Sequence, residues 1–368
     1  MNTQANLLFG VFGLMIGVLV VSFGVSRLVL RKLEVRRVIP EHLVVGRPFF
    51  LVYQFRNGKR FWPSFSVSVA ELDGCEAFAA QPFSYMLHAA SGMTAIVPTE
   101  VRPRRRGVYE LDRFQLATSF PFGFIKRAMV RQRKEAVIVY PALGTVDPRV
   151  LQLGRAAEKT GAMMRPGRGG LDEFYGVKEF RRGDNPRWIY WRRSARTGVL
   201  VCKEMTQVSP PRILVLVDTY LAESEGYNEG AVERAIAMAG SLADHALEAG
   251  MAVGLCVFSE SLVTMAPNRG KRHGREILTV LARLPRNVRH TAQDLVNGSR
   301  ELMKSPTTPV LFTPSDMQLG LGDQIHSGMV VIGSRSAQAR RYFHFASEID
   351  FEGCGPVQRE SGKQGRSR

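Results

Sequence analysis

An uninterrupted apolar run near the amino terminus constrains this chain more than any other feature. The run from Leu7 to Val25, LLFGVFGLMIGVLVVSFGV, contains no charged side chain and only Ser22 as a polar one. A helix needs about 20 apolar residues to cross the hydrocarbon of a bilayer. A cleaved signal peptide would carry positive charge before a shorter apolar core, but no Lys or Arg precedes this run. We therefore expect one membrane-spanning helix.

Positive charge follows the apolar run directly. The basic residues after it are Arg27, Arg31, Lys32, Arg36 and Arg37. Lys and Arg beside one end of a span favour the cytoplasmic side for that end. Residues 1–32 are therefore predicted to form a transmembrane anchor with a basic juxtamembrane segment. The bulk of the chain is expected to lie in the cytoplasm.

The whole chain is strongly basic. Its 368 residues include 50 Lys and Arg against 33 Asp and Glu, which gives a formal net charge of +17. Such an excess attracts anionic lipid headgroups, nucleic acid or an acidic protein. The excess is concentrated between Arg102 and Lys134, in the membrane-proximal third of the chain. A solvated basic face and contact with anionic headgroups are both consistent with this placement.

Motifs of nucleophilic or zinc enzymes do not occur in the sequence. It contains no GxSxG and no HExxH, and its seven histidines show no metal-ligand spacing. The four cysteines are far apart and form no CxxC pair, which favours neither a disulfide framework nor a zinc site; they are Cys75, Cys202, Cys256 and Cys354. We expect a protein of a reducing compartment with no enzymatic activity.

Short strand patterns separated by turns occupy the region after the anchor. No helical periodicity interrupts them, so residues 33–146 are predicted to form a small β-sandwich-like domain. The predicted strands are Phe49–Phe55, Phe65–Ala70, Met93–Val101, Val108–Gln115 and Ala136–Tyr140.

Strands alternate with helices in the carboxyl-terminal part. The all-apolar run Ile213–Val217 is typical of a strand buried on both faces, and a helix with Asn228 as N-cap and Gly250 as stop follows it. Residues 209–352 are therefore predicted to form an α/β domain with a mostly parallel sheet. Residues 147–208 are expected to be a linker with a motif region, and residues 353–368 a disordered tail. The remaining predicted elements are strands Ala252–Phe258, Val310–Thr313 and Met329–Ile332, and helices Arg275–Leu284 and Ala292–Met303.

Two carboxylates follow strands of this α/β pattern. Asp218 and Asp316 come just past predicted strand ends, where the crevice of an open α/β sheet lies. With the hydroxyl of Thr291 they would supply oxygen ligands of the kind that magnesium prefers. The alternative is that each aspartate caps a helix or a turn.

The run Gly183 to Glu204, GDNPRWIYWRRSARTGVLVCKE, combines aromatic side chains with four arginines. Such a combination suits stacked bases and phosphates, and it also suits protein interfaces. We expect a turn, then a helix that begins near Pro186, places Trp188 and Trp191 on one face and ends at Thr197-Gly198. The two indoles are predicted to bury this helix between the domains. Its arginines are expected to pair with Asp172, Glu173, Glu179 or Glu204.

The same run resembles a known family, the membrane-anchored bacterial proteins of the domain-of-unknown-function family fifty-eight. The resemblance rests on EFYGVKEFRRGDNPRWIYWRRSARTGVLVCKE, Glu173 to Glu204, and on the upstream RRRGVYELDRFQLATSFPFGFIKR, Arg104 to Arg127. It implies a β-rich domain beside the bacterial plasma (inner) membrane and then a von Willebrand factor A-like α/β domain. It also implies association with MoxR-type AAA+ ATPases and no established enzymatic reaction.

The sequence departs from the pattern that the resemblance implies at two places. A von Willebrand A metal loop has the form Asp-x-Ser-x-Ser, and this chain has Asp218-Thr219-Tyr220-Leu221-Ala222. With both serines missing, Asp218, Thr291 and Asp316 would form a degenerate magnesium site, and we expect no cofactor. Many relatives also begin with two membrane spans, whereas Leu7 to Leu30 has the length of one.

These observations predict a multidomain, membrane-anchored α+β protein that acts as a non-enzymatic adaptor or assembly factor. Its von Willebrand A-like domain is expected to dock a MoxR-type ATPase or a client protein. One alternative is a membrane protein that binds nucleic acid or anionic lipid, and another is a metal-dependent enzyme at Asp218 and Asp316. The motif residues expected to form an interdomain clasp or a partner-docking surface are Gly183, Asp184, Arg187, Trp188, Trp191, Ser194, Arg196, Thr197, Gly198 and Glu204.

Overall fold

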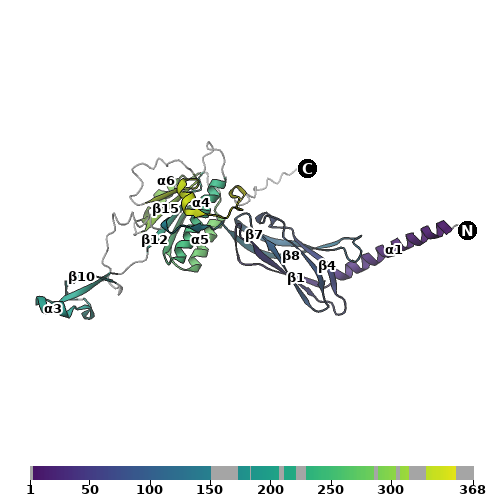
Figure 1. Cartoon of the computed structure of the whole chain (residues 1–368), viewed down its shortest axis with the longest axis horizontal. Coiled ribbons are helices and arrows are strands. Elements are labelled where there is room, and N and C mark those ends of the chain that lie inside the picture. Colours follow the sequence, from purple (N-terminus) through teal and green to yellow (C-terminus); the bar gives the residue numbers. More distant parts are fainter. Residues whose placement is uncertain are drawn as a thin grey trace.

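A computed structural model gives the fold. It describes residues 3–150, 173–182, 184–206, 211–220, 229–285, 289–303, 307–314 and 329–353. Along the chain these residues form an amino-terminal helix, a β domain, a projecting hairpin and an α/β domain (Figure 1).

Helix α1, Thr3–Leu30, projects from the end of the β domain (Figure 1). Leu7–Leu30 is the one candidate span among the described residues, an apolar helix with the length of a membrane span or of a signal sequence. Most of its large apolar side chains from Leu7 to Val21 are exposed, and Phe23 is exposed as well. Beyond them one face of the helix is buried on the β domain, through Ser22, Ser26 and Val29.

The β domain consists of two sheets that share one hydrophobic core. The smaller sheet has the order β1-β3-β6, with β1 Leu33–Val38, β3 Phe49–Asn57 and β6 Thr94–Val101, all antiparallel. The larger has the order β2-β8-β7-β4-β5, with β2 His42–Val44, β8 Arg127–Tyr140, β7 Gly107–Thr118, β4 Ser64–Glu71 and β5 Phe83–Ala89. Inward residues of both sheets, such as Tyr53 and Leu116, are fully buried.

The five strands predicted for this region correspond to β3, β4, β6, β7 and β8. Strand β1 was not predicted because its sequence, LEVRRV, carries three charged residues. One of them, Arg37, is buried in the core. Strand β5 was not predicted because its large side chains Phe83, Tyr85 and Leu87 face outward. Charge and outward apolar side chains obscure the alternation on which strand prediction depends.

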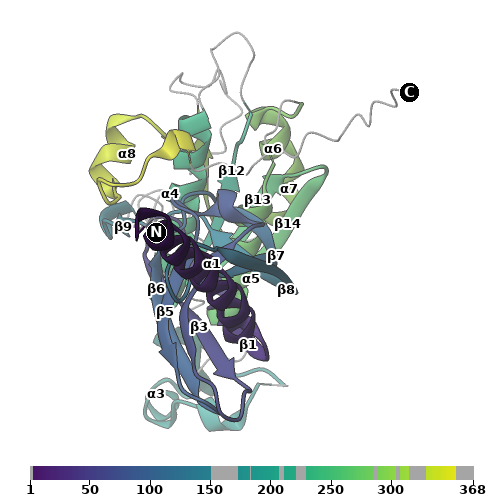
Figure 2. The same cartoon turned by 90° about the vertical axis from the view of Figure 1, so that its right-hand side faces the viewer.

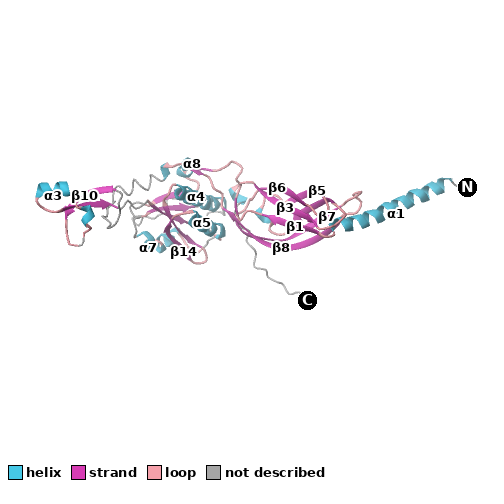
Figure 3. Cartoon of the chain, turned by 90° about the horizontal axis from the view of Figure 1, so that it is seen from below, coloured by secondary structure: helices cyan, strands magenta, loops and turns pink. Residues whose placement is uncertain are grey.

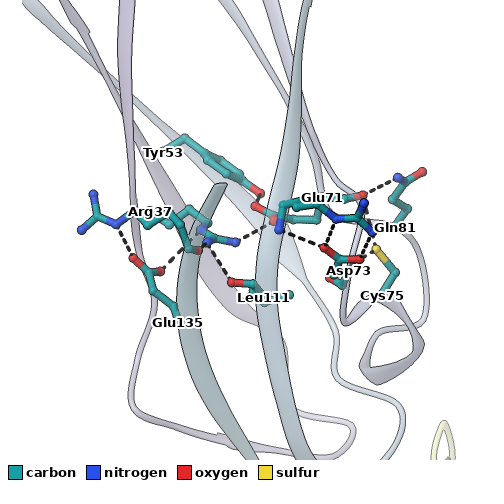
Figure 4. A network of polar contacts seen from close by, with 10 residues as sticks. Arg37, Tyr53, Glu71, Asp73, Cys75, Gln81, Leu111 and Glu135 are labelled. Atoms are coloured by element: carbon teal, nitrogen blue, oxygen red, sulfur yellow. Dashed lines mark hydrogen bonds and ion pairs between the residues drawn. The ribbon is translucent and has the colours of Figure 1, made fainter. Parts of the chain in front are cut away.

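A buried polar network holds Arg37 between the sheets (Figure 4). Its guanidinium pairs with Glu71 at 2.7 Å and donates to the carbonyls of Leu111 and Arg133. The hydroxyl of Tyr53 donates to the other carboxylate oxygen of Glu71 at 2.9 Å. Burial raises the pKa of Glu71, while Arg37 and the Tyr53 hydrogen bond act in the opposite direction. The network therefore compensates one buried charge with another.

The α/β domain has one five-stranded sheet with the order β14-β13-β12-β15-β16. Strands β12, β13, β15 and β16 run parallel, and β14 is an antiparallel edge strand. Their bounds are β12 Arg212–Val217, β13 Ala252–Phe258, β14 Leu262–Asn268, β15 Thr308–Thr313 and β16 Val330–Gly333. The mostly parallel sheet predicted from the sequence is present, but β14 was not predicted.

Helices cover both faces of this sheet. Val215 and Val217 of β12 pack with α4, Glu229–Glu248, and α5, Lys271–Arg283. Leu214 and Leu216 pack with α6, Ala292–Gly298, on the other face. The predicted helix Ala292–Met303 is interrupted at the buried Ser299, and α7, Arg300–Met303, follows. The predicted N-cap Asn228 lies outside the described residues.

The chain returns to the β domain after the last sheet strand. Helix α8, Ala337–Tyr342, leads into β17, Phe343–His344, which pairs with β9, Thr145–Val146 (Figure 2). Phe345 and Phe351, the latter in the 3₁₀ turn Phe351–Gly353, then pack against the core of the β domain. This return contact and α8 were not predicted. The predicted disordered tail lies almost entirely outside the described residues.

Candidate functional site

The motif region forms a separate projecting hairpin, here called the arm, which comprises residues 173–182 and 184–206. Figure 1 and Figure 3 show it apart from both domains. Strands β10, Glu173–Glu179, and β11, Val201–Thr206, pair in antiparallel register. Between them lie the 3₁₀ turn η2, Pro186–Trp188, and helix α3, Trp191–Thr197.

Ser194 ties the helix of the arm to its sheet. Its buried hydroxyl accepts a hydrogen bond from the amide of Val201 at 2.9 Å and donates to the carbonyl of Tyr190 at 3.1 Å. Gly198 ends α3 in a left-handed conformation, with φ of 70°, and its amide donates to the carbonyl of Ser194. A glycine fits this position because it has no Cβ to oppose positive φ. Ser194 and Gly198 thus serve the fold of the arm.

Asp184 and Asn185 shape the opposite turn. The carboxylate of Asp184 accepts from the ammonium of Lys178 and from the amide of Arg181, both at 3.0 Å. The side chain of Asn185 caps η2 by accepting from the amide of Arg187. These contacts explain the predicted turn in terms of local hydrogen bonds. Gly183 lies outside the described residues.

The predicted single helix with both tryptophans on one face is wrong. Pro186–Trp188 is a 3₁₀ turn, and the chain then extends so that Ile189 bridges Cys202 before α3 begins at Trp191. The indole of Trp188 is partly buried, whereas the Trp191 residue is 66% exposed. The prediction that both indoles bury the helix between the domains is therefore wrong for Trp191. The spacing of the two tryptophans did not predict this break, because the β-bridge at Ile189 requires extended backbone where a continuous helix would have to pass.

All six arginines in the described part of the arm are exposed, and so is Trp191. Within 173–206 the sequence has eight basic and four acidic residues. Val199 and Leu200 add exposed apolar surface after the helix. The exposed arginines are Arg181, Arg182, Arg187, Arg192, Arg193 and Arg196. This composition of one exposed indole, apolar neighbours and guanidinium groups is typical of the residues that carry binding energy at protein interfaces.

The predicted pairing of these arginines with acidic residues is tested only in part. Glu179 is exposed, and the ion pair found within the described part of the arm joins Lys178 to Asp184. Asp172 and the side chains of Glu173 and Glu204 lie outside the described residues.

Asp218 follows β12 at the carboxyl edge of the α/β sheet and is buried. Its two carboxylate oxygens accept from the amide of Tyr220 at 2.9 Å and from the hydroxyl of Thr313 at 3.1 Å. Burial raises the pKa of Asp218 to about 6. The neighbouring Thr219 hydroxyl is buried and has no hydrogen-bond partner among the described residues.

The donors around Asp218 do not fit a tight magnesium site. Both of its oxygens already accept protein hydrogen bonds, and Tyr220 occupies a position where a serine hydroxyl would be needed. Thr291 is the N-cap of α6 and exchanges hydrogen bonds with Asp294 in a capping box. Asp316 lies outside the described residues. Among the described residues, no group of three or more His, Cys, Asp or Glu is arranged to hold a metal.

The chain belongs to a class of multidomain proteins with an apolar amino-terminal helix, a β domain, a projecting arm and an α/β domain with a mostly parallel sheet. Residues 176–308 match the profile of the family described as "Protein of unknown function DUF58". The match covers most of the arm and much of the α/β domain, and it supports the family resemblance found in the motif.

No curated protein matches this chain. Three solved structures are remotely similar to this chain. Two are crystal structures of a beta-glucosidase from Listeria innocua, in complex with gluconolactone and with glucose, each 12% identical, with TM-scores of 0.18 and 0.17 and coverage of 29% of this chain and 16% of theirs. A third is Spo0M, a sporulation control protein from Bacillus subtilis, 11% identical, with a TM-score of 0.17 and coverage of 36% of this chain and 57% of that one. Similarities of this size carry no argument.

Proposed function

We propose that this chain is a membrane-tethered adaptor without an enzymatic reaction of its own, and that its arm is the surface that docks a protein partner. Helix α1 is the tether, in the bacterial plasma membrane, and the bulk of the chain lies in the cytoplasm. The α/β domain is of the von Willebrand A type. A MoxR-type AAA+ ATPase is the partner that the family resemblance implies.

The exposed indole of Trp191 is the observation that carries the proposal. Exposing a tryptophan in water forgoes the free energy of burying one of the largest apolar side chains, about 2 kcal/mol or more. The arm is nevertheless held in shape around it by the buried hydroxyl of Ser194 and by the strand pair β10 and β11. A fixed scaffold that presents an exposed tryptophan among arginines has the composition of an interface hot spot.

Binding to a purified partner tests the proposal. The full chain is placed in lipid nanodiscs and titrated with the MoxR-type ATPase of the same organism, with ADP, with ATP and with a non-hydrolysable analogue. Trp191→Ala is expected to weaken binding about tenfold or more, because a hot-spot side chain contributes about 2 kcal/mol. Ile96→Ala is the matched control, since Ile96 is an equally exposed apolar residue on β6 of the β domain. Lack of binding in every nucleotide state would contradict the proposed partner.

The basic surface supports a second candidate function, the binding of nucleic acid or anionic lipid. The formal charge of +17 and the basic excess of the arm favour it. It predicts an association with a DNA or RNA oligonucleotide that weakens steeply as salt increases. If the full chain in nanodiscs binds neither DNA nor RNA at low salt, nucleic-acid binding is excluded as its function.

A further inference from the structure

Three loops and the exit of α1 lie at the same end of the β domain. The strand registers require this, because Leu33 pairs with Asn57, Arg56 with Thr94 and Ser64 with Ala89. Thr118 at the end of β7 likewise pairs with Arg127 at the start of β8. The loops 58–63, 90–93 and 119–126 therefore lie at the end of the domain from which the helix leaves, and together they are here called the anchor end.

Contacts fix α1 against these loops. The ammonium of Lys59 donates to the carbonyl of Val29 at 2.8 Å, near the end of the helix. On the far side of the third loop, at the start of β8, the guanidinium of Arg127 lies over the ring of Phe23 in the helix, 5.6 Å from the ring centroid. The end of loop 119–126, which Arg127 directly follows, is therefore beside Phe23, nearer the amino terminus of the helix than the contact of Lys59 with Val29.

Large apolar side chains are exposed at the anchor end. Each loop contributes at least one, and their exposed fractions range from 52% to 77%. They are Phe61 and Trp62 in the first loop, Met93 in the second, and Phe122 and Phe124 in the third. Tryptophan is enriched where membrane proteins meet the headgroup region of a bilayer, and Phe accompanies Trp on the apolar faces of segments that lie in that region.

The charge of the anchor end is of one sign. The three loops expose Arg60 and Lys126 and contain no acidic residue, while Lys59 is buried against the helix. The exposed Arg27, Arg31 and Lys32 adjoin the loops at the end of the helix. Each Lys or Arg near an anionic leaflet gains about 1 kcal/mol. The surface thus combines apolar tips with cationic groups, and a bilayer interface offers both an apolar and an anionic layer.

The length of the free helix sets how far the β domain stands from the membrane. Among the residues with described burial, the stretch from Leu7 to Val21 precedes the first side chain buried on the domain, Ser22, and is about 22 Å long at 1.5 Å per residue. The hydrocarbon of a bilayer is about 30 Å thick. The span is therefore complete only if the bilayer reaches the level of Phe23, where loop 119–126 lies.

We propose that the anchor end of the β domain rests in the interfacial layer of the leaflet that α1 enters, with its aromatic tips at the acyl boundary and its basic residues at the headgroups. The inference rests on the proposed membrane tether. It adds a second, peripheral contact that fixes the orientation of the β domain relative to the membrane. The arm, on the far side of the α/β domain, is then directed away from the bilayer (Figure 1).

Tryptophan quenching by brominated lipids tests this contact in the full chain. Trp62, Trp188 and Trp191 are first replaced by Phe, and one new tryptophan is introduced as Phe124→Trp, Phe50→Trp or Phe12→Trp. Each protein is placed in phosphatidylcholine and phosphatidylglycerol nanodiscs brominated either at a shallow or at a deep acyl position. Phe50 is an exposed phenylalanine at the opposite end of the same domain, and Phe12 is in the middle of the free helix.

The expected result is a loss of emission from Phe124→Trp that is larger with shallow bromine than with deep bromine. Phe50→Trp should keep its emission with both lipids, and Phe12→Trp should lose more with deep bromine. If Phe12→Trp is quenched and Phe124→Trp behaves like Phe50→Trp, the contact is overturned while the tether stands. If Phe12→Trp is not quenched, the tether itself fails. A blue-shifted but unquenched Phe124→Trp would mean that protein covers the tip, which also overturns the proposal.

Discussion

Arg106 and Glu233 form a buried ion pair that joins the β domain to the α/β domain. The guanidinium Nε lies 2.7 Å from one carboxylate oxygen of Glu233, and Nη2 lies 2.9 Å from the other. The remaining nitrogen, Nη1, donates to the carbonyls of Leu281 and Leu284 at the end of α5. One arginine thus neutralises a carboxylate and caps a helix of the neighbouring domain.

Glu233→Ala is expected to lower the free energy of unfolding by about 3 to 5 kcal/mol, because it leaves the Arg106 charge buried without its partner. Urea unfolding of the detergent-solubilised chain, followed by near-ultraviolet circular dichroism, measures the change. Arg104→Ala is the control. Its ion pair with Asp350, at 3.5 Å, is exposed on both sides and should contribute less than about 1 kcal/mol. Equal losses in the two variants would contradict the role of the buried pair.

Glu71→Ala should lower the free energy of unfolding of the β domain by about 3 to 5 kcal/mol, because Arg37 would lose its buried carboxylate partner. Tyr53→Phe removes only the hydrogen bond from the hydroxyl to Glu71 and should cost about 1 to 2 kcal/mol. Tyr85→Phe serves as the control, because the hydroxyl of Tyr85 is exposed where it contacts Ser66. The same unfolding measurement ranks the three variants, and a different order would argue against the network.

Asp218 should make stability depend on pH. Burial raises its pKa in the folded chain to about 6, whereas an unfolded aspartate ionises near a pKa of about 3.9. The folded state therefore binds the proton more tightly. The free energy of unfolding is expected to fall by about 2 to 3 kcal/mol as pH rises from about 4 to about 6, and then to level off.

Asp218→Asn should remove this slope, because an amide keeps the shape and does not ionise. Comparing the pH dependence of urea unfolding in the two proteins isolates the contribution of Asp218. Asp73→Asn is a control of opposite sign, since the hydrogen bonds of Arg113 lower the pKa of Asp73. A wild-type curve that is parallel to that of Asp218→Asn between pH 4 and 6 would refute the assignment.

Ser194→Ala should loosen the arm without unfolding either domain. The amide of Val201 would lose its buried acceptor, at a cost of about 1 to 3 kcal/mol. Its hydrogen exchange should become about tenfold faster or more, which mass spectrometry of the arm peptide can follow. Thr197→Ala is the control, because the hydroxyl of Thr197 is exposed and bonds only to carbonyls of its own turn. Unchanged exchange in Ser194→Ala would show that the strand pair alone holds the arm.

The local sequence pattern was sufficient to predict the position of those helices and strands that consist mainly of buried apolar residues. The strand Ala252–Phe258 has the predicted bounds, and α4 ends before the predicted stop at Gly250. Each consists mainly of apolar residues that are buried along most of its length, and β13 is buried on both faces of the sheet. The turn at Asp184 and the end of α3 at Gly198 were also predictable, because each depends on residues within a few positions.

The position of the candidate site along the chain could be predicted, but the solvent exposure of its side chains could not. The motif located the arm, yet the two tryptophans, three residues apart, have different environments, and Trp191 faces solvent. A bridge between Ile189 and Cys202 decides this, and their pairing depends on the register of β10 with β11. No spacing within the motif encodes that register.

Composition and near neighbours were enough to predict the apolar helix, the alternation of parallel strands with helices in the α/β domain, and the basic charge. The burial of Arg37 and Arg106, the return of the last residues to the β domain and the position of three separate loops beside the exit of α1 became visible only in the folded chain. Such features depend on distant partners, because a charge enters a core only where a carboxylate or carbonyl from elsewhere in the chain is brought to meet it.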